Sequence, residues 1–250
     1  MPDSLTTLRG RSASRWVEVT AVVGCGNGCV YCPQDKLSAA YGRGGSRALG
    51  AETFGLLLDH LDPATATIHF SGFSEIFLHP QGHEFIAQAY ERTFDVMLCT
   101  TLVGLTADKI SYLVDRAVRF EWVRLHEFDS PTFDRTSFER LGNLLRGAGL
   151  TANFSSARVR RPVSRGGSMW DSGFHAGPVV CDRVECNVVL PDGRVCLCCC
   201  DWGLRHVIGN LSTQDYDGVE MVEARRLVRE AAATPGASVV CKTCEVGVRL

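Results

Sequence analysis

A short segment near the start of the chain, 24–33 (GCGNGCVYCP), holds three cysteines at positions 25, 29 and 32. It follows a mostly apolar run, 17–23, that is typical of a β-strand. Thiolates at this spacing on a glycine-rich loop can surround one metal centre, and three ligands leave one iron of a four-iron cluster open to a small molecule. The alternatives are a disulfide cluster or a zinc site, and zinc would need a distant fourth ligand.

The composition of the chain indicates in what kind of protein this loop occurs. The chain has 250 residues, 45% hydrophobic and 22% charged, as in ordinary globular proteins. A formal net charge of −2 gives no reason to expect nucleic acid or an anionic membrane as a partner. No apolar run is long enough to span a membrane, and the polar segment 1–15 lacks the apolar core of a secretion signal. Twelve cysteines in such a chain predict metal sites in a reducing cytoplasm.

Strand-like and helix-like segments alternate after the loop. Strands are expected over 17–23, 66–70, 94–100, 120–125 and 150–155, and helices over 51–61, 80–93, 106–117 and 130–147. The polar, glycine-rich segment 34–50 is predicted to be a surface loop. This alternation predicts an α/β fold with a parallel sheet, open or closed into a barrel. In such sheets the active site lies at the carboxyl ends of the strands, where the cysteine loop follows the first strand.

Polar residues follow two of the later strands. After 66–70, Gly72 lets the backbone approach a ligand, while Ser74 and Glu75 can accept hydrogen bonds from an ammonium group. Alone, such a segment is more often a simple turn than a binding site. After 120–125, His126 and Glu127 are interpreted either as a capping or surface pair or as groups for substrate contact and acid–base work. Cys99 is expected to be a small core residue.

The C-terminal part, 178–250, is predicted to be a small module that follows a sheet domain over 16–177 and a polar segment over 1–15. Two strands, 185–190 and 194–197, form a hairpin around Pro-Asp-Gly, and 219–233 is helical. Cys241 and Cys244 supply two thiolates of a zinc or iron–sulfur site. The other candidate ligands in this module are Cys181, Cys196, Cys198, Cys199 and Cys200. On a strand, Cys196 and Cys198 would share a face while Cys199 points away.

The cysteine loop, with an aromatic residue before its last cysteine, resembles the cluster loop of the radical S-adenosylmethionine (radical SAM) superfamily. The resemblance implies a partial (β/α)6 TIM-like barrel in which Cys25, Cys29 and Cys32 hold a [4Fe-4S] cluster. In that family the open iron chelates S-adenosylmethionine, and one electron cleaves it to a 5′-deoxyadenosyl radical. Tyr31 would pack over the cluster or the adenine.

Other segments resemble further parts of the same superfamily. Gly72 to Glu75 is similar to its glycine-glycine-glutamate segment, which binds the amino group of S-adenosylmethionine, although Ser74 and Ile76 depart from the pattern. Polar residues at the next strand ends border the cofactor in this family, which here implies Thr100 and Ser155. Ser164-Arg165-Gly166-Gly167 looks like a segment of radical SAM dehydrogenases that act on aminocyclitols. The resemblance gives Arg165 a role in binding polar groups near the cofactor and in catalysis. His126, at the end of the strand 120–125, is the second catalytic candidate. The loop arginines 158, 160 and 161 are interpreted equally well as solvated.

The C-terminal cysteines resemble the twitch domain, a shortened SPASM domain that binds an auxiliary cluster. The pattern Cys181-(x11)-Gly193-(x4)-Cys198, followed by C-x2-C, implies one auxiliary [4Fe-4S] cluster with four ligands, which are Cys181, Cys198, Cys241 and Cys244. Cys186, Cys196, Cys199 and Cys200 are left over. Zinc remains the alternative at this site.

Together these resemblances imply an oxidoreductase. The radical would abstract hydrogen from a C–H bond of a polar small molecule, sugar or aminocyclitol-like, and oxidise an alcohol to a ketone with the auxiliary cluster as electron acceptor. A flavodoxin- or ferredoxin-type protein would supply electrons. The alternatives are a redox-neutral epimerase, which needs a free thiol such as Cys186, a peptide maturase, and a non-enzymatic zinc-binding module.

Overall fold

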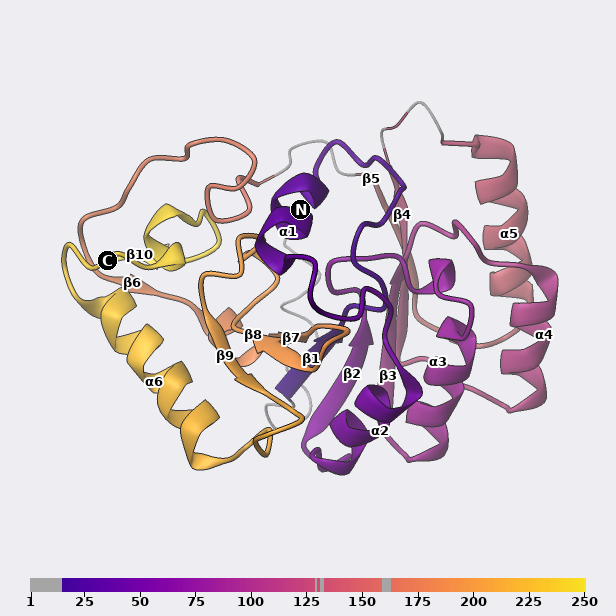
Figure 1. Ribbon diagram of the computed structural model, residues 1–250. Coiled ribbons are helices and arrows are strands. Elements are labelled where there is room, and N and C mark those ends of the chain that lie inside the picture. The colour runs from indigo at the N-terminus through magenta and orange to yellow at the C-terminus, as the bar shows by residue number, and fades with distance from the viewer. Residues whose placement is uncertain (1–14, 129, 131–132, 159–162) are drawn as a thin grey trace.

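The computed structural model describes residues 15–128, 130, 133–158 and 163–250 (Figure 1). Strands and helices alternate through its first half. The strands are β1 (Arg15–Val19), β2 (Ala66–Phe70), β3 (Asp95–Thr100), β4 (Trp122–Glu127) and β5 (Phe154–Arg158). The helices are α1 (Gln34–Tyr41), α2 (Ala51–Asp59), α3 (Gly82–Glu91), α4 (Ala107–Asp115) and α5 (Arg135–Gly147), with a short 3-10 turn, η1 (Ile76–Leu78), after β2.

The strands form one eight-stranded sheet in the order β5-β4-β3-β2-β1-β7-β8-β9. Strands β1 to β5 are parallel to their neighbours, and β7 (Asn187–Val189) adds a further parallel strand beside β1. The last two strands, β8 (Arg194–Cys196) and β9 (Val207–Asn210), are antiparallel. The predicted α/β class with a parallel sheet is therefore confirmed, and the sheet continues into the C-terminal part of the chain.

One face of the sheet is apolar and carries the helices. Alternate residues of the central strands, such as Val17, Ile68, Leu98 and Val123, are fully buried in the same cluster as Phe54 of α2. Figure 1 shows α3, α4 and α5 stacked beside β2 to β4. Burial of this apolar face holds the parallel strands in register.

The opposite, inner face of the sheet carries polar and aromatic residues in rows. Strand register puts one row across β1 to β4, formed by Glu18, His69, Met97 and Trp122. The next row toward the carboxyl ends contains Cys99, Arg124 and Ser155. Side chains alternate between faces along a strand, so both rows lie on the face opposite the helices.

Two helix starts show where local chemistry decides the boundary. The Thr106 hydroxyl accepts a hydrogen bond from the Lys109 N–H, which confirms the predicted start of α4. Helix α5 starts at Arg135, five residues later than the predicted start at residue 130. Its N-cap is Asp134, whose carboxylate accepts from the N–H groups of Thr136 and Ser137. The proline at 131 lies outside the described residues.

The predicted loop over 34–50 is wrong in its first half, which forms helix α1. Leu37 and Tyr41 lie four residues apart and are both buried, in a small cluster with Val23, Phe73 and Trp202. Leu37 and Tyr41 are the only buried residues of α1, so its apolar stripe is too narrow to stand out from the polar sequence around it. Tertiary packing therefore forms this helix where the local pattern favours a loop.

The C-terminal part packs helix α6 (Val219–Ala233), which is predicted with these bounds, against β9 and β6 (Val179–Val180). Strand β10 (Val248–Arg249) pairs antiparallel with β6, and two 3-10 turns are present, η2 (Asp182–Glu185) and η3 (Val240–Thr243). The buried Asn187 side chain joins these pieces, because its oxygen accepts from Tyr216 and Arg225. In the described part of the chain, no helix is both long enough and apolar enough to cross a membrane.

Candidate active site

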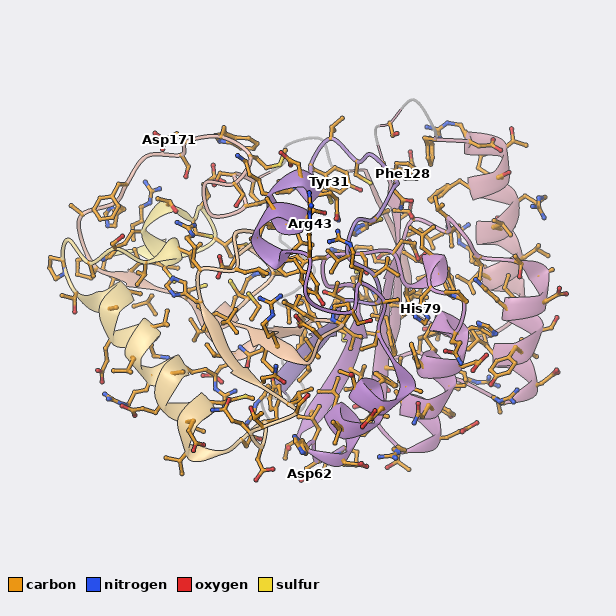
Figure 2. The ribbon with its side chains drawn as sticks, in the orientation of Figure 1. Tyr31, Arg43, Asp62, His79, Phe128 and Asp171 are labelled. Carbon is orange, nitrogen blue, oxygen red and sulfur yellow. The ribbon has the colours of Figure 1, made fainter. Side chains whose placement is uncertain are left out.

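The cysteine loop lies at the carboxyl ends of the parallel strands. Figure 2 shows Tyr31, on this loop, at the same end of the molecule as Phe128, which follows β4, while Asp62, which precedes β2, lies at the opposite end. Cys25, Cys29 and Cys32 all line one cavity of about 300 Å³. This volume is at the lower end of the range for small-molecule sites.

The three loop thiols are half-buried, and two of them contact each other. A hydrogen bond from the Cys32 thiol lowers the pKa of Cys29, and the same bond raises the pKa of Cys32. Burial raises the pKa of Cys25. Sulfur donors gathered at one end of a cavity are the donor set that iron–sulfur clusters use. In chemical type, the residues present therefore fit such a group.

Unpaired polar atoms in the cavity wall point to a missing ligand. The Tyr31 hydroxyl, the Gln34 side-chain oxygen and the Trp202 indole N–H are buried and have no hydrogen-bond partner among the described residues. Buried polar groups are nearly always paired. A polar ligand in this cavity would supply the partners that the described residues do not.

Gly72 and Ser74 join the end of β2 to the chain that enters the cysteine loop. The Ser74 hydroxyl accepts from the N–H groups of Ala21 and Val22, at 3.0 and 3.2 Å. Gly72 has φ +48°, and a Cβ there would lie 2.7 Å from the Val19 carbonyl oxygen. Glycine is thus required for this close approach to the backbone of β1, and the predicted approach of Gly72 to a ligand stays a prediction.

The Gly72→Ala variant should be destabilised by about 2–4 kcal/mol, since alanine is strained at positive φ and its methyl group would clash with the backbone of β1. Urea unfolding measures this loss. The matched control is Gly55→Ala, in the middle of α2, where an added Cβ meets nothing within 4 Å. The control should be neutral or up to about 1 kcal/mol more stable. Equal stability of the two variants would contradict the tight approach at Gly72.

Glu75 is fully engaged inside the protein. One carboxylate oxygen accepts from the Phe77 N–H and the Thr100 hydroxyl, and the other accepts from the N–H and the hydroxyl of Thr101. The side chain is 4% exposed, and burial raises its pKa. A carboxylate offers about four acceptor sites. Glu75 is therefore a positioning residue that ties the ends of β2 and β3 together at the cavity.

The Glu75→Gln variant should lose about 2–3 kcal/mol of stability, because the amide would turn an NH2 group toward donors that need an acceptor. It should also weaken ligand binding in the cavity, since Thr100 and Thr101 line it. Thermal unfolding and S-adenosylmethionine titration measure the two effects. Glu84→Gln, in α3, is the matched control, since Glu84 accepts only from Gln81 among the described side chains. Unchanged stability of Glu75→Gln would contradict the positioning role.

Arg165 and His126, the two predicted catalytic residues, are far apart in sequence but line the same cavity. The Arg165 Nε donates to the Tyr31 carbonyl oxygen at 3.4 Å, and its guanidinium lies 6.0 Å from the Trp202 ring. Burial lowers the pKa of His126 to about 4, with Arg124 and Arg165 adding to the effect, so His126 is neutral at pH 7. Positions 160 and 161 and the side chain at 158 lie outside the described residues.

Some of the other predicted site residues line the cavity and some do not. Thr100 lines the cavity, whereas Ser155 lies on β5 opposite Arg124 and is not among the lining residues. Glu127 pairs with Arg135 instead of facing the cavity. Cys99, expected in the core, lines the cavity with its Sγ 3.4 Å from the His69 Nε2.

The part of the cavity farthest from the cysteine loop, its floor, was not predicted from the sequence. This floor is lined by Trp16, Glu18, His69 and Trp122 from the strands, and by Arg183 and Cys199 from the C-terminal part. The sequence did hold an indication of this floor. Glu18 and His69 are each a polar residue between apolar neighbours on a strand, as expected for a strand with one polar-lined face. Their proximity depends on the pairing of β1 with β2.

A second cavity brings the C-terminal cysteines together. Cys181, Cys198, Cys241 and Cys244 line it, together with Cys200. Burial and the neighbouring thiols raise the pKa of Cys241 to about 12, while a hydrogen bond from Cys200 lowers the pKa of Cys244 to about 6. Five sulfur donors at one apolar site fit a sulfur-ligated metal group in chemical type. In the described residues, no three His, Cys, Asp or Glu side chains are arranged around a single ion.

The predicted alternation of the cysteine run is wrong. Strand β8 ends at Cys196, which packs with Phe73 and Trp202, away from the second cavity. The buried Asp201 carboxylate accepts from the N–H groups of residues 205 and 206 and holds the turn that follows. This turn sends Cys198 to the second cavity and Cys199 to the first, where Arg183 donates to its sulfur at 3.6 Å.

Solved structures share this fold, while neither a protein-family model nor a curated protein matches the sequence. BtrN in complex with AdoMet and 2-DOIA, a radical SAM 2-deoxy-scyllo-inosamine dehydrogenase, is 17% identical, with a TM-score of 0.72 over 94% of each chain. anSMEcpe with bound AdoMet is 12% identical, with a TM-score of 0.56 over 94% of this chain and 85% of that chain.

SuiB of Streptococcus suis bound to precursor peptide SuiA is 9% identical, with a TM-score of 0.52 over 94% of this chain and 71% of that chain. All three are radical SAM enzymes. The chain therefore has the fold of radical SAM enzymes, and the resemblance inferred from its cysteine loop is confirmed at the level of the fold.

Proposed function

We propose that this chain is a radical SAM oxidoreductase that oxidises an alcohol of a polar small molecule, sugar or aminocyclitol-like, to a ketone. The observation that carries the proposal is one cavity, at the carboxyl ends of parallel strands, that is lined by all three loop cysteines together with Tyr31 and Arg165. The shared fold with enzymes that bind AdoMet supports it.

Cys25, Cys29 and Cys32 would hold a [4Fe-4S] cluster, and the unpaired atoms of Tyr31 and Gln34 would meet S-adenosylmethionine. When bound, the cluster and S-adenosylmethionine together supply one-electron cleavage of the sulfonium and the radical that removes hydrogen from the substrate. The chain's own residues do the positioning. Glu75 fixes the strand ends, and Thr100, which donates to it, forms the adjoining wall.

Arg165 and His126 would act on the substrate. Arg165 brings a positive charge to the cavity beside the cysteine loop and stabilises negative charge that develops on a substrate oxygen. His126 is neutral at pH 7, so it can accept a hydrogen bond from a substrate hydroxyl. The two groups together would orient a C–OH group while the hydrogen atom of its C–H bond is removed, and the hydroxyl proton would leave to His126 or to solvent.

The segment 178–250 would form the auxiliary-cluster module, with Cys181, Cys198, Cys241 and Cys244 as ligands. When bound, an auxiliary [4Fe-4S] cluster supplies an electron acceptor that makes net oxidation possible. Arg183 lines both cavities, and the turn 198–200 contributes cysteines to each of them, so the two cavities are neighbours. A flavodoxin- or ferredoxin-type reductant in the cytoplasm would complete the cycle.

Anaerobic turnover of polyols deuterated at each carbinol carbon tests the reaction. The proposal expects deuterium in 5′-deoxyadenosine and one ketone for each 5′-deoxyadenosine formed. Deuterium transfer without a ketone would contradict the oxidation and leave the radical step intact. No deuterium transfer from any polyol would contradict the substrate class.

A redox-neutral epimerase is the second candidate, because Cys99 and Cys199 both line the cavity. An epimerase needs a thiol that returns a hydrogen atom to the substrate radical. Cys186, the thiol favoured from the sequence, lines neither cysteine-containing cavity. Turnover in D2O separates the candidates, since only the epimerase places solvent deuterium on the product carbon.

A further inference from the structure

Glu18 and His69 form a pair at the floor of the active-site cavity. They are direct neighbours across β1 and β2 and project from the inner face of the sheet. Both are more than nine-tenths buried, and both line the cavity. Their row lies one step farther from the cysteine loop than the row of Cys99 and Arg124. The pair therefore faces the part of the cavity that the loop and the strand-end residues leave free.

The two side chains have capacity for a ligand. The Ser71 hydroxyl donates to one Glu18 oxygen at 2.9 Å, whereas the Glu75 carboxylate accepts four hydrogen bonds. The His69 Nε2 lies 3.4 Å from the Cys99 sulfur, and its Nδ1 is buried with no hydrogen-bond partner among the described residues. A buried ring nitrogen without a partner costs stability unless a ligand group pairs with it.

Aromatic rings flank the pair. The His69 ring lies 6.0 Å from Trp16, edge to face, and 6.3 Å from Trp122, measured between ring centroids. Arg183 and Cys199 complete the wall beside Glu18. The Arg124 guanidinium lies 4.4 Å from the centroid of the Trp122 ring, so the wall around the carboxylate and the imidazole is partly aromatic and partly cationic. This combination suits a small ring with hydroxyl groups on its rim and C–H bonds on its faces.

We propose that Glu18 and His69 bind two hydroxyl groups of a polyhydroxylated six-membered ring, with one face of the ring against Trp122. Glu18 accepts from one hydroxyl, and the His69 Nδ1 pairs with a second. The inference rests on the proposed function, which places S-adenosylmethionine at the cysteine-loop end of the same cavity. Glu18 and His69 would then select the substrate. Neither lies in the segments that resemble the radical SAM superfamily.

Calorimetric titration of the anaerobically reconstituted protein tests the pair. With S-adenosylmethionine present and no reductant, no turnover occurs, so binding is measured at equilibrium. The probes are myo-inositol, 2-deoxy-scyllo-inosamine and, as the ring that lacks most hydroxyls, cyclohexanol. At least one of the first two should bind, and cyclohexanol should not.

The variants Glu18→Gln and His69→Phe should each weaken polyol binding by about tenfold or more, because each leaves a substrate hydroxyl unpaired. The matched control, Glu121→Gln, replaces an exposed carboxylate just before β4 and should bind polyols as the wild type does. S-adenosylmethionine affinity should stay unchanged in all three variants, which separates loss of substrate binding from misfolding.

Three outcomes would overturn the inference. Wild-type protein that binds S-adenosylmethionine but neither polyol would overturn the substrate class and leave the proposed function standing. Polyol binding that survives both substitutions would overturn the role of the pair. Failure to bind S-adenosylmethionine would overturn the proposed function, and the inference with it.

Discussion

The Cys29→Ala variant is expected to bind about four fewer irons than the wild type and to form no detectable 5′-deoxyadenosine. Cys29 lies between the other two loop cysteines and shares a hydrogen bond with the Cys32 thiol. Two thiolates cannot hold a cluster that needs three protein ligands at this loop. Iron and sulfide analysis, with electron paramagnetic resonance of the reduced protein, measures the loss.

The control for this variant is Cys186→Ala, which removes a cysteine that lines neither cysteine-containing cavity. It should keep about eight irons and normal cleavage of S-adenosylmethionine. A Cys29→Ala protein with the same iron content and cleavage rate as the control would show that the loop does not hold the cluster.

The Cys241→Ala variant is expected to lose the auxiliary cluster, again about four irons, and to keep cleavage of S-adenosylmethionine. Ketone formation should fall below detection, since the electron from the substrate radical then has no acceptor. The first cavity should be intact, because Cys241 lines only the second. Loss of both clusters in this variant would contradict two independent sites.

Parallel substitutions identify the fourth auxiliary ligand. Both Cys198 and Cys200 line the second cavity, so proximity does not choose between them. The twitch-like spacing from Gly193 favours Cys198, so Cys198→Ala should match Cys241→Ala in iron content, and Cys200→Ala should match the wild type. The reverse result would make Cys200 the ligand.

Much of the fold follows from local pattern. Strand β2 and helix α6 have the predicted bounds, because a short apolar run and a long helical period are strong signals. Helix α1 was missed because only Leu37 and Tyr41 are buried on it. The alternation argument at Cys196 to Cys199 failed because the strand ends at Cys196. Boundaries set by tertiary contacts are not visible in a local window.

The candidate site likewise has a part that could be predicted from the sequence and a part that could not. The loop cysteines, Gly72 and Glu75 could be found because the groups in each segment are neighbours in sequence. The floor could not, because Glu18 and His69 are about fifty residues apart and meet only through the register of β1 and β2. Glu75 accepts four internal hydrogen bonds that its sequence segment does not reveal. It also lines the cavity, and its contact with a ligand stays a prediction.

The central claim is that the cysteine loop supports radical cleavage of S-adenosylmethionine. The most direct measurement is product analysis after the anaerobically reconstituted protein is incubated with S-adenosylmethionine and dithionite. We expect a brown protein that forms 5′-deoxyadenosine and methionine in equal amounts. A colourless protein that binds zinc and leaves S-adenosylmethionine intact would contradict it.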